Sequence, residues 1–153
     1  MFEQPNLVCL TSGSAEGGSE LTAFDNALRK AGIGDVNLIR VSSIVPTGAR
    51  IAPLPNLPMG ALTPAAYAKV VSTVPGRRIA ACVGVGWTPQ GGVLMEVDAL
   101  DQTIEEIEER AHAMVDEAMR ARSLDPYEFH VVTAEHTVET IGSAVAAAVL
   151  WGR

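Results

Sequence analysis

The sequence predicts an α+β fold with mostly antiparallel sheet, and two observations support this prediction. Segments with the pattern of a strand outnumber those with the pattern of a helix. The two kinds do not alternate in the regular order of a parallel, doubly wound sheet. The 153 residues are 48% hydrophobic, which is enough apolar material to form the core of a single domain covering residues 1–153.

The predicted strands are short, mostly apolar runs bounded by Gly, Pro or Ser. In chain order they cover residues 6–11, 36–41, 79–87, 92–97, 128–134 and 144–151. Between the third and fourth of these runs lies Thr88-Pro89-Gln90-Gly91, whose composition predicts a turn that joins a strand pair. The last run is dense in alanine and fits a strand or a buried helix, and Gly142-Ser143 before it favours a strand.

Two helices are predicted from their caps and from the spacing of their apolar residues. Ser19 is placed to cap the first helix, and Gly32 to end it. The apolar residues that share one face of this helix are Leu21, Phe24, Leu28 and Ala31. The second helix is longer and opens with the capping box Thr103–Glu106. Its apolar stripe comprises Ile104, Ile107, Ala111, Met114, Ala118 and Met119.

Two segments are predicted to lack regular structure. Residues 12–18 are rich in serine and glycine and are expected to form a loop. Residues 46–64 contain five of the nine prolines, so this segment is expected to be extended and irregular. Because the segment is nevertheless apolar, we expect it to pack against a surface, and a neighbouring subunit is one possibility.

Charge and hydropathy exclude several classes of function. The formal net charge is −7, so no nucleic acid is expected as a partner, because neutralising phosphates requires a basic surface. The apolar runs are too short to cross a bilayer, and the first residues lack the basic and apolar regions of a signal peptide. We therefore expect no membrane partner and a cytoplasmic location. Half of the acidic residues lie within residues 96–117, which is typical of a solvated helix face.

The cysteines and histidines do not predict a metal site. Cys9 and Cys82 lie in apolar runs, so we expect buried free thiols, with a single disulfide as the alternative. His112, His130 and His136 have no metal-ligand spacing relative to the cysteines. Each histidine is therefore expected to be a surface or structural residue.

Three polar residues lie where a purely structural role explains them poorly. Asp25 falls among the apolar positions of the first helix, and pairing with Arg29 one turn later is the alternative to a functional role. Glu96 interrupts an apolar strand, as either a general acid or a solvent-facing residue at the strand end. Asn37 alternates in phase with Ser43, so a regular strand would point both to one face; the alternative is a buried amide that satisfies a turn.

Several stretches occur together and in a fixed order along the chain. They are Ala31–Pro46, Leu54–Leu62, Leu94–Glu96, Ala134–Glu139 and Ala146–Trp151. Together they resemble the pyruvoyl-dependent arginine decarboxylases, and the resemblance extends over nearly the whole chain.

The resemblance implies a proenzyme that cuts itself between Ser42 and Ser43. In the family, the hydroxyl of the second serine attacks the carbonyl of the first, and the peptide bond becomes an ester. Elimination and loss of ammonia then leave a pyruvoyl group at position 43. The expected products are a β chain of residues 1–42 and an α chain of residues 43–153. The α chain carries the pyruvoyl cofactor derived from Ser43, with no pyridoxal phosphate and no metal.

The resemblance also implies a role for each of the three polar residues. The pyruvoyl carbonyl forms a Schiff base with the amine of arginine and accepts electrons as carbon dioxide leaves, which yields agmatine. Glu96 matches the proton donor, a role that needs a protonated carboxyl in a desolvated site. Asn37 matches a residue of self-processing, whose amide would polarise the Ser42 carbonyl. Asp25 matches the carboxylate that pairs with the substrate guanidinium.

Family members are αββα sandwiches assembled as homotrimers, with active sites between subunits. The resemblance therefore refines the α+β prediction to a layered αββα sandwich and implies a homotrimer. Two alternatives stay open. In the first, the chain carries out the same chemistry with another amino acid as substrate. In the second, it is an uncleaved, non-catalytic trimeric homologue that serves as a binding or scaffold protein.

Overall fold

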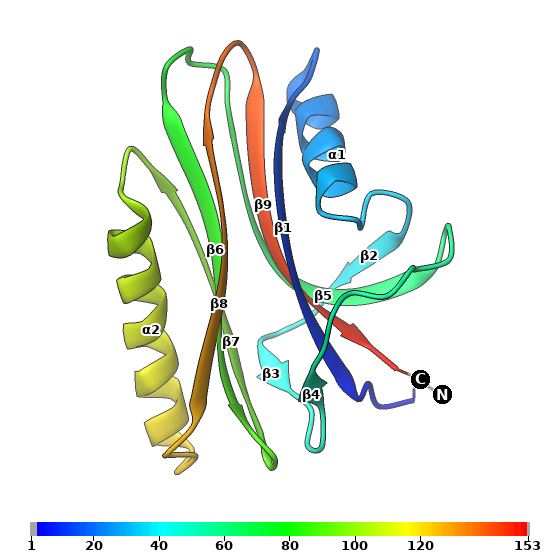
Figure 1. The fold of residues 1–153 in the computed structure, drawn as a ribbon, viewed down its shortest axis with the longest axis vertical. Coiled ribbons are helices and arrows are strands. Elements are labelled where there is room, and N and C mark those ends of the chain that lie inside the picture. Colours follow the sequence, from blue (N-terminus) through cyan, green and yellow to red (C-terminus); the bar gives the residue numbers. More distant parts are fainter. Residues whose placement is uncertain (1–2, 153) are drawn as a thin grey trace.

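The computed structural model describes residues 3–152, which form two β-sheets packed face to face (Figure 1). In chain order the elements are β1 (Leu7–Glu16), α1 (Glu20–Lys30), β2 (Asn37–Arg40), β3 (Ile44–Val45), β4 (Arg50–Ile51), β5 (Leu62–Ser72), β6 (Arg78–Thr88), β7 (Gly91–Leu100), α2 (Ile104–Ala121), β8 (Glu128–Thr137) and β9 (Gly142–Trp151). One sheet has the strand order β2-β5-β9-β1-β4 and the other β3-β7-β6-β8.

Each sheet carries one helix on its outer face. α1 packs on β1 and β9 of the five-stranded sheet, whereas α2 packs on β6 and β7 of the four-stranded sheet (Figure 1). The strand pairs are antiparallel except for β1 with β4 and β2 with β5. The predicted α+β class, with mostly antiparallel sheets in an αββα sandwich, is therefore confirmed.

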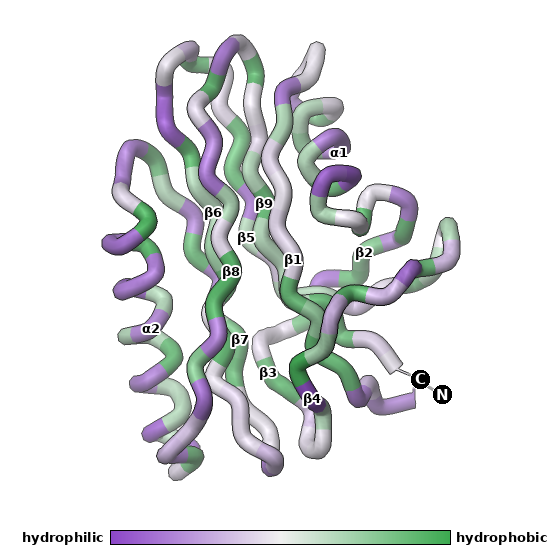
Figure 2. The backbone as a smooth tube through the Cα atoms, in the orientation of Figure 1, coloured by the Kyte–Doolittle hydropathy of each residue, from purple (hydrophilic) through white to green (hydrophobic). Residues whose placement is uncertain are grey.

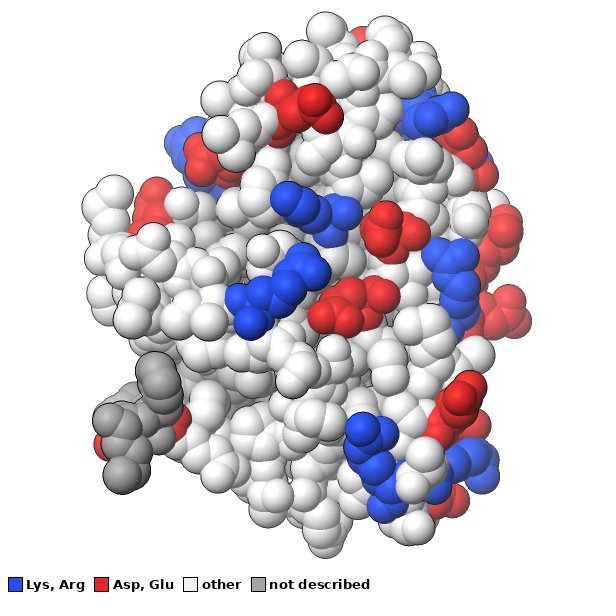
Figure 3. Space-filling model, turned by 180° about the vertical axis from the view of Figure 1, so that it is seen from behind, with Lys and Arg blue, Asp and Glu red and all other residues white. Residues whose placement is uncertain are grey.

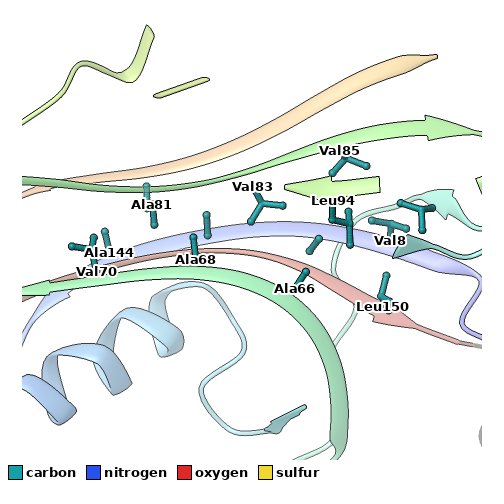
Figure 4. Packing of buried hydrophobic residues seen from close by; sticks show 14 of the residues in the cluster. Val8, Ala66, Ala68, Val70, Ala81, Val83, Val85, Leu94, Ala144 and Leu150 are labelled. Carbon is teal, nitrogen blue, oxygen red and sulfur yellow. The ribbon is translucent and has the colours of Figure 1, made fainter. Parts of the chain in front are cut away.

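Small apolar side chains fill the space between the sheets (Figure 4). Alternate residues of each strand point inward, as the two-residue period of a strand requires. In β9 these residues are Ala144, Ala146 and Ala148, and in β6 they include Val83 and Val85. Figure 2 shows hydrophilic and hydrophobic residues alternating along α2, which buries one stripe and exposes the other.

Most of the predicted elements are confirmed. The Ser19 hydroxyl accepts a hydrogen bond from the Thr22 N–H at 3.1 Å, and Gly32 ends the helix with a positive φ of 80°. The Thr103–Glu106 capping box opens α2. The alanine-rich run before Trp151 is a strand, β9, buried along nearly its whole length.

The buried face of α1 differs from the predicted one. Ala23 and Ala27 are fully buried, whereas Leu21 is 75% exposed. Gly13 of β1 explains the difference, because a Cβ at this position would lie 2.5 Å from the Ala27 carbonyl oxygen. The helix backbone thus rests directly on the strand, and only small residues fit between them. The prediction that Asp25 lies in the apolar stripe is wrong, since its side chain is exposed.

Two strands extend beyond their predicted lengths. β1 continues to Glu16, through most of the predicted loop, because it pairs with β9 along its full length of ten residues. β5 was predicted only as an irregular segment up to Pro64 and as no element beyond it. Pairing with β9 on one side and with β2 on the other makes it a strand of eleven residues.

The proline-rich segment 46–64 is irregular apart from β4 and the start of β5, as predicted. Leu54 and Leu57 pack against the apolar cluster beneath α1. The segment therefore covers a surface of its own chain, although Met59 remains 85% exposed.

Cys9 and Cys82 are buried free thiols, as predicted. Cys9 lies in the apolar cluster beneath α1 and Cys82 in the one beneath α2, on opposite sides of the sandwich. Burial raises the pKa of both thiols. Neither helix of residues 3–152 has the length and apolar character that crossing a membrane would require.

Candidate active site

The serine pair lies where the chain crosses from one sheet to the other. β2 ends at Arg40 in the five-stranded sheet, and β3 begins at Ile44 in the four-stranded sheet. Ser42 is exposed and Ser43 is half-buried in a bend between the two strands. The Ser42–Ser43 peptide bond is thus part of a short connection between the two layers.

Three hydrogen bonds surround this peptide bond. The Ser43 hydroxyl donates to Glu96 Oε2 at 3.3 Å. The Ile44 N–H donates to the Ser42 carbonyl at 3.0 Å, and the Leu94 N–H donates to the Ser43 carbonyl at 2.9 Å. A hydroxyl nucleophile, a polarised carbonyl and a carboxyl group therefore meet at one point.

Glu96 points toward the space between the sheets. It lies directly opposite Val83 of β6 and two residues after Leu94, and both of these side chains belong to the inter-sheet core (Figure 4). The carboxyl is half-buried. The alternative of a solvent-facing residue at a strand end is therefore not what the structure shows.

Asn37 lies at the opposite end of β2 from the serine pair. Its side-chain amide donates to the Gly60 carbonyl at 2.9 Å, and its backbone N–H donates to the Ala61 carbonyl at 2.9 Å. It thus satisfies a turn, although it is exposed rather than buried. β2 stops before Ser43, so the expected regular alternation between Asn37 and Ser43 is broken. At about 3.3 Å per residue, Asn37 lies roughly 16 Å from Ser42 along the chain.

Asp25 lies on α1, on the outer face of the five-stranded sheet, and the structure does not bring it to the serine pair within one chain. The expected alternative, a pair with Arg29, is not formed either, since the Arg29 guanidinium donates to Asn26 Oδ1 at 3.3 Å. A cavity of about 650 Å³ opens at the C-terminal end of the same helix, with Arg29 and Gly34 among its lining residues. Ser43 does not line this cavity.

Similarity to known proteins identifies the family of this chain. The chain matches the family model described as pyruvoyl-dependent arginine decarboxylase over residues 7–152 and belongs to that family. A relative from Methanocaldococcus jannaschii with the name pyruvoyl-dependent arginine decarboxylase is 47% identical, over 98% of this chain and 92% of that protein.

Two further relatives have the same name. The protein of Methanococcus maripaludis strain C5 is 40% identical over 98% of this chain and 93% of its own length. That of Methanothermobacter thermautotrophicus is 42% identical over 93% of this chain and 94% of its own length. The resemblance seen in the sequence is therefore confirmed.

A second polar cluster lies away from the serine pair and was missed in the sequence. His136 Nε2 lies 2.6 Å from Glu16 Oε2, which joins β8 of one sheet to β1 of the other. The backbone N–H groups of Glu139, Thr140 and Ile141 also donate to the Glu16 carboxylate. Part of the Ala134–Glu139 motif therefore serves to clasp the two sheets together.

The clasp depends on the charge of Glu16. Burial by itself would raise the pKa of this carboxyl, but the hydrogen bond with His136 and those with three backbone N–H groups outweigh it. The pKa is lowered from an ordinary value of 4.5 to about 2. The charged form thus stabilises the fold fully above about pH 4.5, and this stabilisation is lost as the pH falls toward 2.

Glu16→Gln should lower the free energy of unfolding by about 2 kcal/mol at pH 7, because the amide is neutral and cannot replace the carboxylate. The difference from the parent should shrink as the pH falls below 4.5. Urea unfolding at several pH values, in a Ser43→Ala background that prevents self-cleavage, measures both effects. Glu139→Gln, which changes an exposed side chain of the same turn, is the matched control. A difference that stays constant down to pH 3 would contradict the role of the charge.

Proposed function

We propose that this chain cuts itself between Ser42 and Ser43 and then converts L-arginine to agmatine and carbon dioxide with the pyruvoyl group formed from Ser43. Family membership supports the class of reaction. The observation that carries the proposal is the hydrogen bond from the Ser43 hydroxyl to Glu96. Next to it, the Ser42 carbonyl accepts a hydrogen bond from the Ile44 N–H. Neither pyridoxal phosphate nor a metal enters the proposal, and the expected cytoplasmic location stays a prediction.

In the proposed self-cleavage, Ser43 Oγ attacks the carbonyl carbon of Ser42, and the bond from that carbon to the Ser43 nitrogen breaks. An ester forms, and the nitrogen becomes a free amine. Negative charge develops on the Ser42 oxygen during the attack, and the Ile44 N–H donates to this same oxygen. Loss of the Ser42 carboxylate and of the proton on Cα then leaves a dehydroalanine, which takes up water and releases ammonia.

The strand pairing indicates that the two fragments of a cleaved chain would stay associated. Residues 1–42 would contribute β1, α1 and β2, and residues 43–153 the remaining elements. β1 lies between β9 and β4, and β2 pairs with β5. Every strand that pairs with β1 or β2 thus belongs to residues 43–153, so the two fragments would remain associated until the protein is denatured.

The residues around position 43 suit the group formed there. A pyruvoyl group supplies an electrophilic carbonyl that captures the substrate amine and takes up electrons as carbon dioxide leaves. The Leu94 N–H holds the carbonyl of residue 43 against β7. Glu96, within hydrogen-bond reach of this residue, would give a proton to the substrate Cα, and the apolar Val83 opposite it limits access of water.

The processing role proposed for Asn37 is indirect within one chain. Its two hydrogen bonds to the turn at Gly60 and Ala61 fix where β2 starts and therefore its register on β5. Through that register Asn37 would set the position of the serine pair at the other end of the strand. A direct contact with the Ser42 carbonyl would require a large movement.

We also propose a homotrimer in which Asp25 of one chain faces Ser43 of another. α1 lies outside the five-stranded sheet, whereas Ser43 lies between the layers, so one chain does not bring the two together. Leu21 near Asp25 and Leu62 on β5 are 75% and 64% exposed, so an apolar side chain on each surface is free to contact another subunit. Seen from behind, side chains of both charges stand next to a wide uncharged area (Figure 3). No observation favours the uncleaved scaffold.

Formation of the pyruvoyl cofactor from Ser43 should change the mass of the chain. Intact mass measured under denaturing conditions should show two species, residues 1–42 and residues 43–153 with a blocked N-terminus. Ser43→Ala should remain a single chain of 153 residues, because it lacks the nucleophile. Ser42→Ala, which keeps the Ser43 hydroxyl, is the matched control and should still be cut. A wild-type chain that stays intact on long incubation would contradict the proposed function.

Glu96→Gln should still cleave itself but lose decarboxylation. The amide oxygen can accept from the Ser43 hydroxyl, whereas the neutral amide cannot give a proton to the substrate. We expect kcat per cleaved chain to fall by about 100-fold or more. The measurement combines intact mass with carbon dioxide release, and Asp98→Asn, on the same strand but exposed, is the control. Full activity of the Gln variant would remove Glu96 from the mechanism.

Asp25→Asn should mainly weaken arginine binding, because a guanidinium loses its bidentate, charged partner. We expect KM for arginine to rise by about 30-fold or more, with a smaller change in kcat. Glu20→Gln, an exposed carboxylate earlier on the same helix, is the control. Product identification with a panel of amino acids tests the alternative substrates. An unchanged KM would return Asp25 to a surface role.

A further inference from the structure

The edge of β5 becomes free where β2 ends. β2 pairs with β5 over only four residues, the last pair being Arg40 with Ala65. Beyond this pair β5 continues to Ser72 with β9 on one side, and the other side has no strand among residues 3–152. A free strand edge presents unpaired N–H and carbonyl groups, which proteins commonly cover with side chains.

The Arg40 side chain covers the first free carbonyl of this edge. Its Nη2 donates to the Tyr67 carbonyl oxygen at 3.0 Å. Its Cζ also lies over the Tyr67 ring, 4.2 Å from the ring centroid, so the guanidinium makes a cation–π contact with the same residue. A hydrogen bond and a stacking contact together fix both the position and the plane of the guanidinium.

The pair of contacts between Arg40 and Tyr67, called the clamp below, lies two residues before the scissile peptide bond. After Arg40, the Val41 N–H makes one last backbone contact with the five-stranded sheet, to the Ala65 carbonyl at 3.2 Å. On the far side, the Leu94 N–H already holds the Ser43 carbonyl to the other sheet at 2.9 Å. The orientation of the Ser42 carbonyl relative to the Ser43 side chain therefore depends on how firmly the end of β2 is held.

We propose that Arg40 is a positioning residue for self-cleavage, because its contact with Tyr67 keeps the Ser42 carbonyl oriented for attack by the Ser43 hydroxyl. This role rests on the proposed self-cleavage at this bond. Attack by a hydroxyl on a neighbouring carbonyl is sensitive to distance, and a misplacement of about 1 Å can cost about 100-fold in rate. Arg40 touches neither reacting group and acts only through the end of β2.

The test is a time course of self-cleavage followed by intact mass for freshly made chains. Arg40→Gln should cleave about tenfold more slowly than wild type, because the Gln side chain is too short to place its amide where Nη2 lies and has no guanidinium to stack on the Tyr67 ring. Arg40→Lys should recover part of the rate, since an ammonium can still donate to the Tyr67 carbonyl but has no plane to stack. Arg122→Gln is the matched control, because the Arg122 guanidinium also donates to a backbone carbonyl, that of Ala118, at the end of α2.

Two further readouts separate positioning from general stability. Arginine turnover per cleaved chain should stay within about twofold of wild type in Arg40→Gln, because the clamp acts before the bond is cut. Thermal unfolding in the Ser43→Ala background shows whether the assay temperature lies well below Tm for each variant. Tyr67→Phe keeps both the ring and the carbonyl and should cleave at the wild-type rate, whereas Tyr67→Leu should be slower.

The outcomes distinguish this role from the proposed function. A wild-type chain that never cleaves would overturn both. If wild type cleaves and Arg40→Gln cleaves equally fast, only the clamp is overturned. It is also overturned if Arg122→Gln slows cleavage to the same extent, or if turnover per cleaved chain falls in parallel with the cleavage rate.

Discussion

The short connection between β2 and β3 is the constraint on which the site depends. Its two ends belong to different sheets, and packed sheets lie about 10 Å apart. Only residues 41–43 separate the strands, and the four steps from Arg40 to Ile44 span at most about 14 Å. The connection can therefore adopt few conformations that join the two sheets. Because each end is hydrogen-bonded to its own sheet, the serine pair is held in one place and one orientation.

Contacts outside this connection also hold the two sheets together. Small residues such as Ala146 and Val83 hold the sheets together across their whole inner faces. Glu16 and His136 clasp them at a point remote from the serine pair in sequence. β1 is paired on both sides by strands that lie after position 43. A break at the serine pair would thus leave the sandwich intact, which is what self-cleavage in a folded enzyme requires.

The candidate site has two parts. One chain brings together the residues for self-cleavage, but it does not bring Asp25 to them. The serine pair, Glu96 and the backbone N–H groups around them are already in contact in a single chain. Asp25 lies on the outer side of a sheet and joins them only if a second chain supplies one half. Self-cleavage and substrate binding would therefore depend on different parts of the site.

The sequence by itself determined the features that depend on neighbours along the chain. The caps at Ser19 and Thr103, the turn before Gly92, the irregular proline-rich segment and the family all follow from local residue types and their order. The family motifs also pointed to the serine pair and to Glu96, whose contact the structure then showed.

Only the tertiary structure decided features that depend on residues far apart. The buried face of α1 follows from the missing side chain of Gly13, and β5 exists because two other strands flank it. Asn37 finds its partner 23 residues away at Gly60, and Glu16 lies 120 residues from His136. Periodicity and local propensity carry no information about such partners, because the free energy of these contacts arises only once the two sheets have packed.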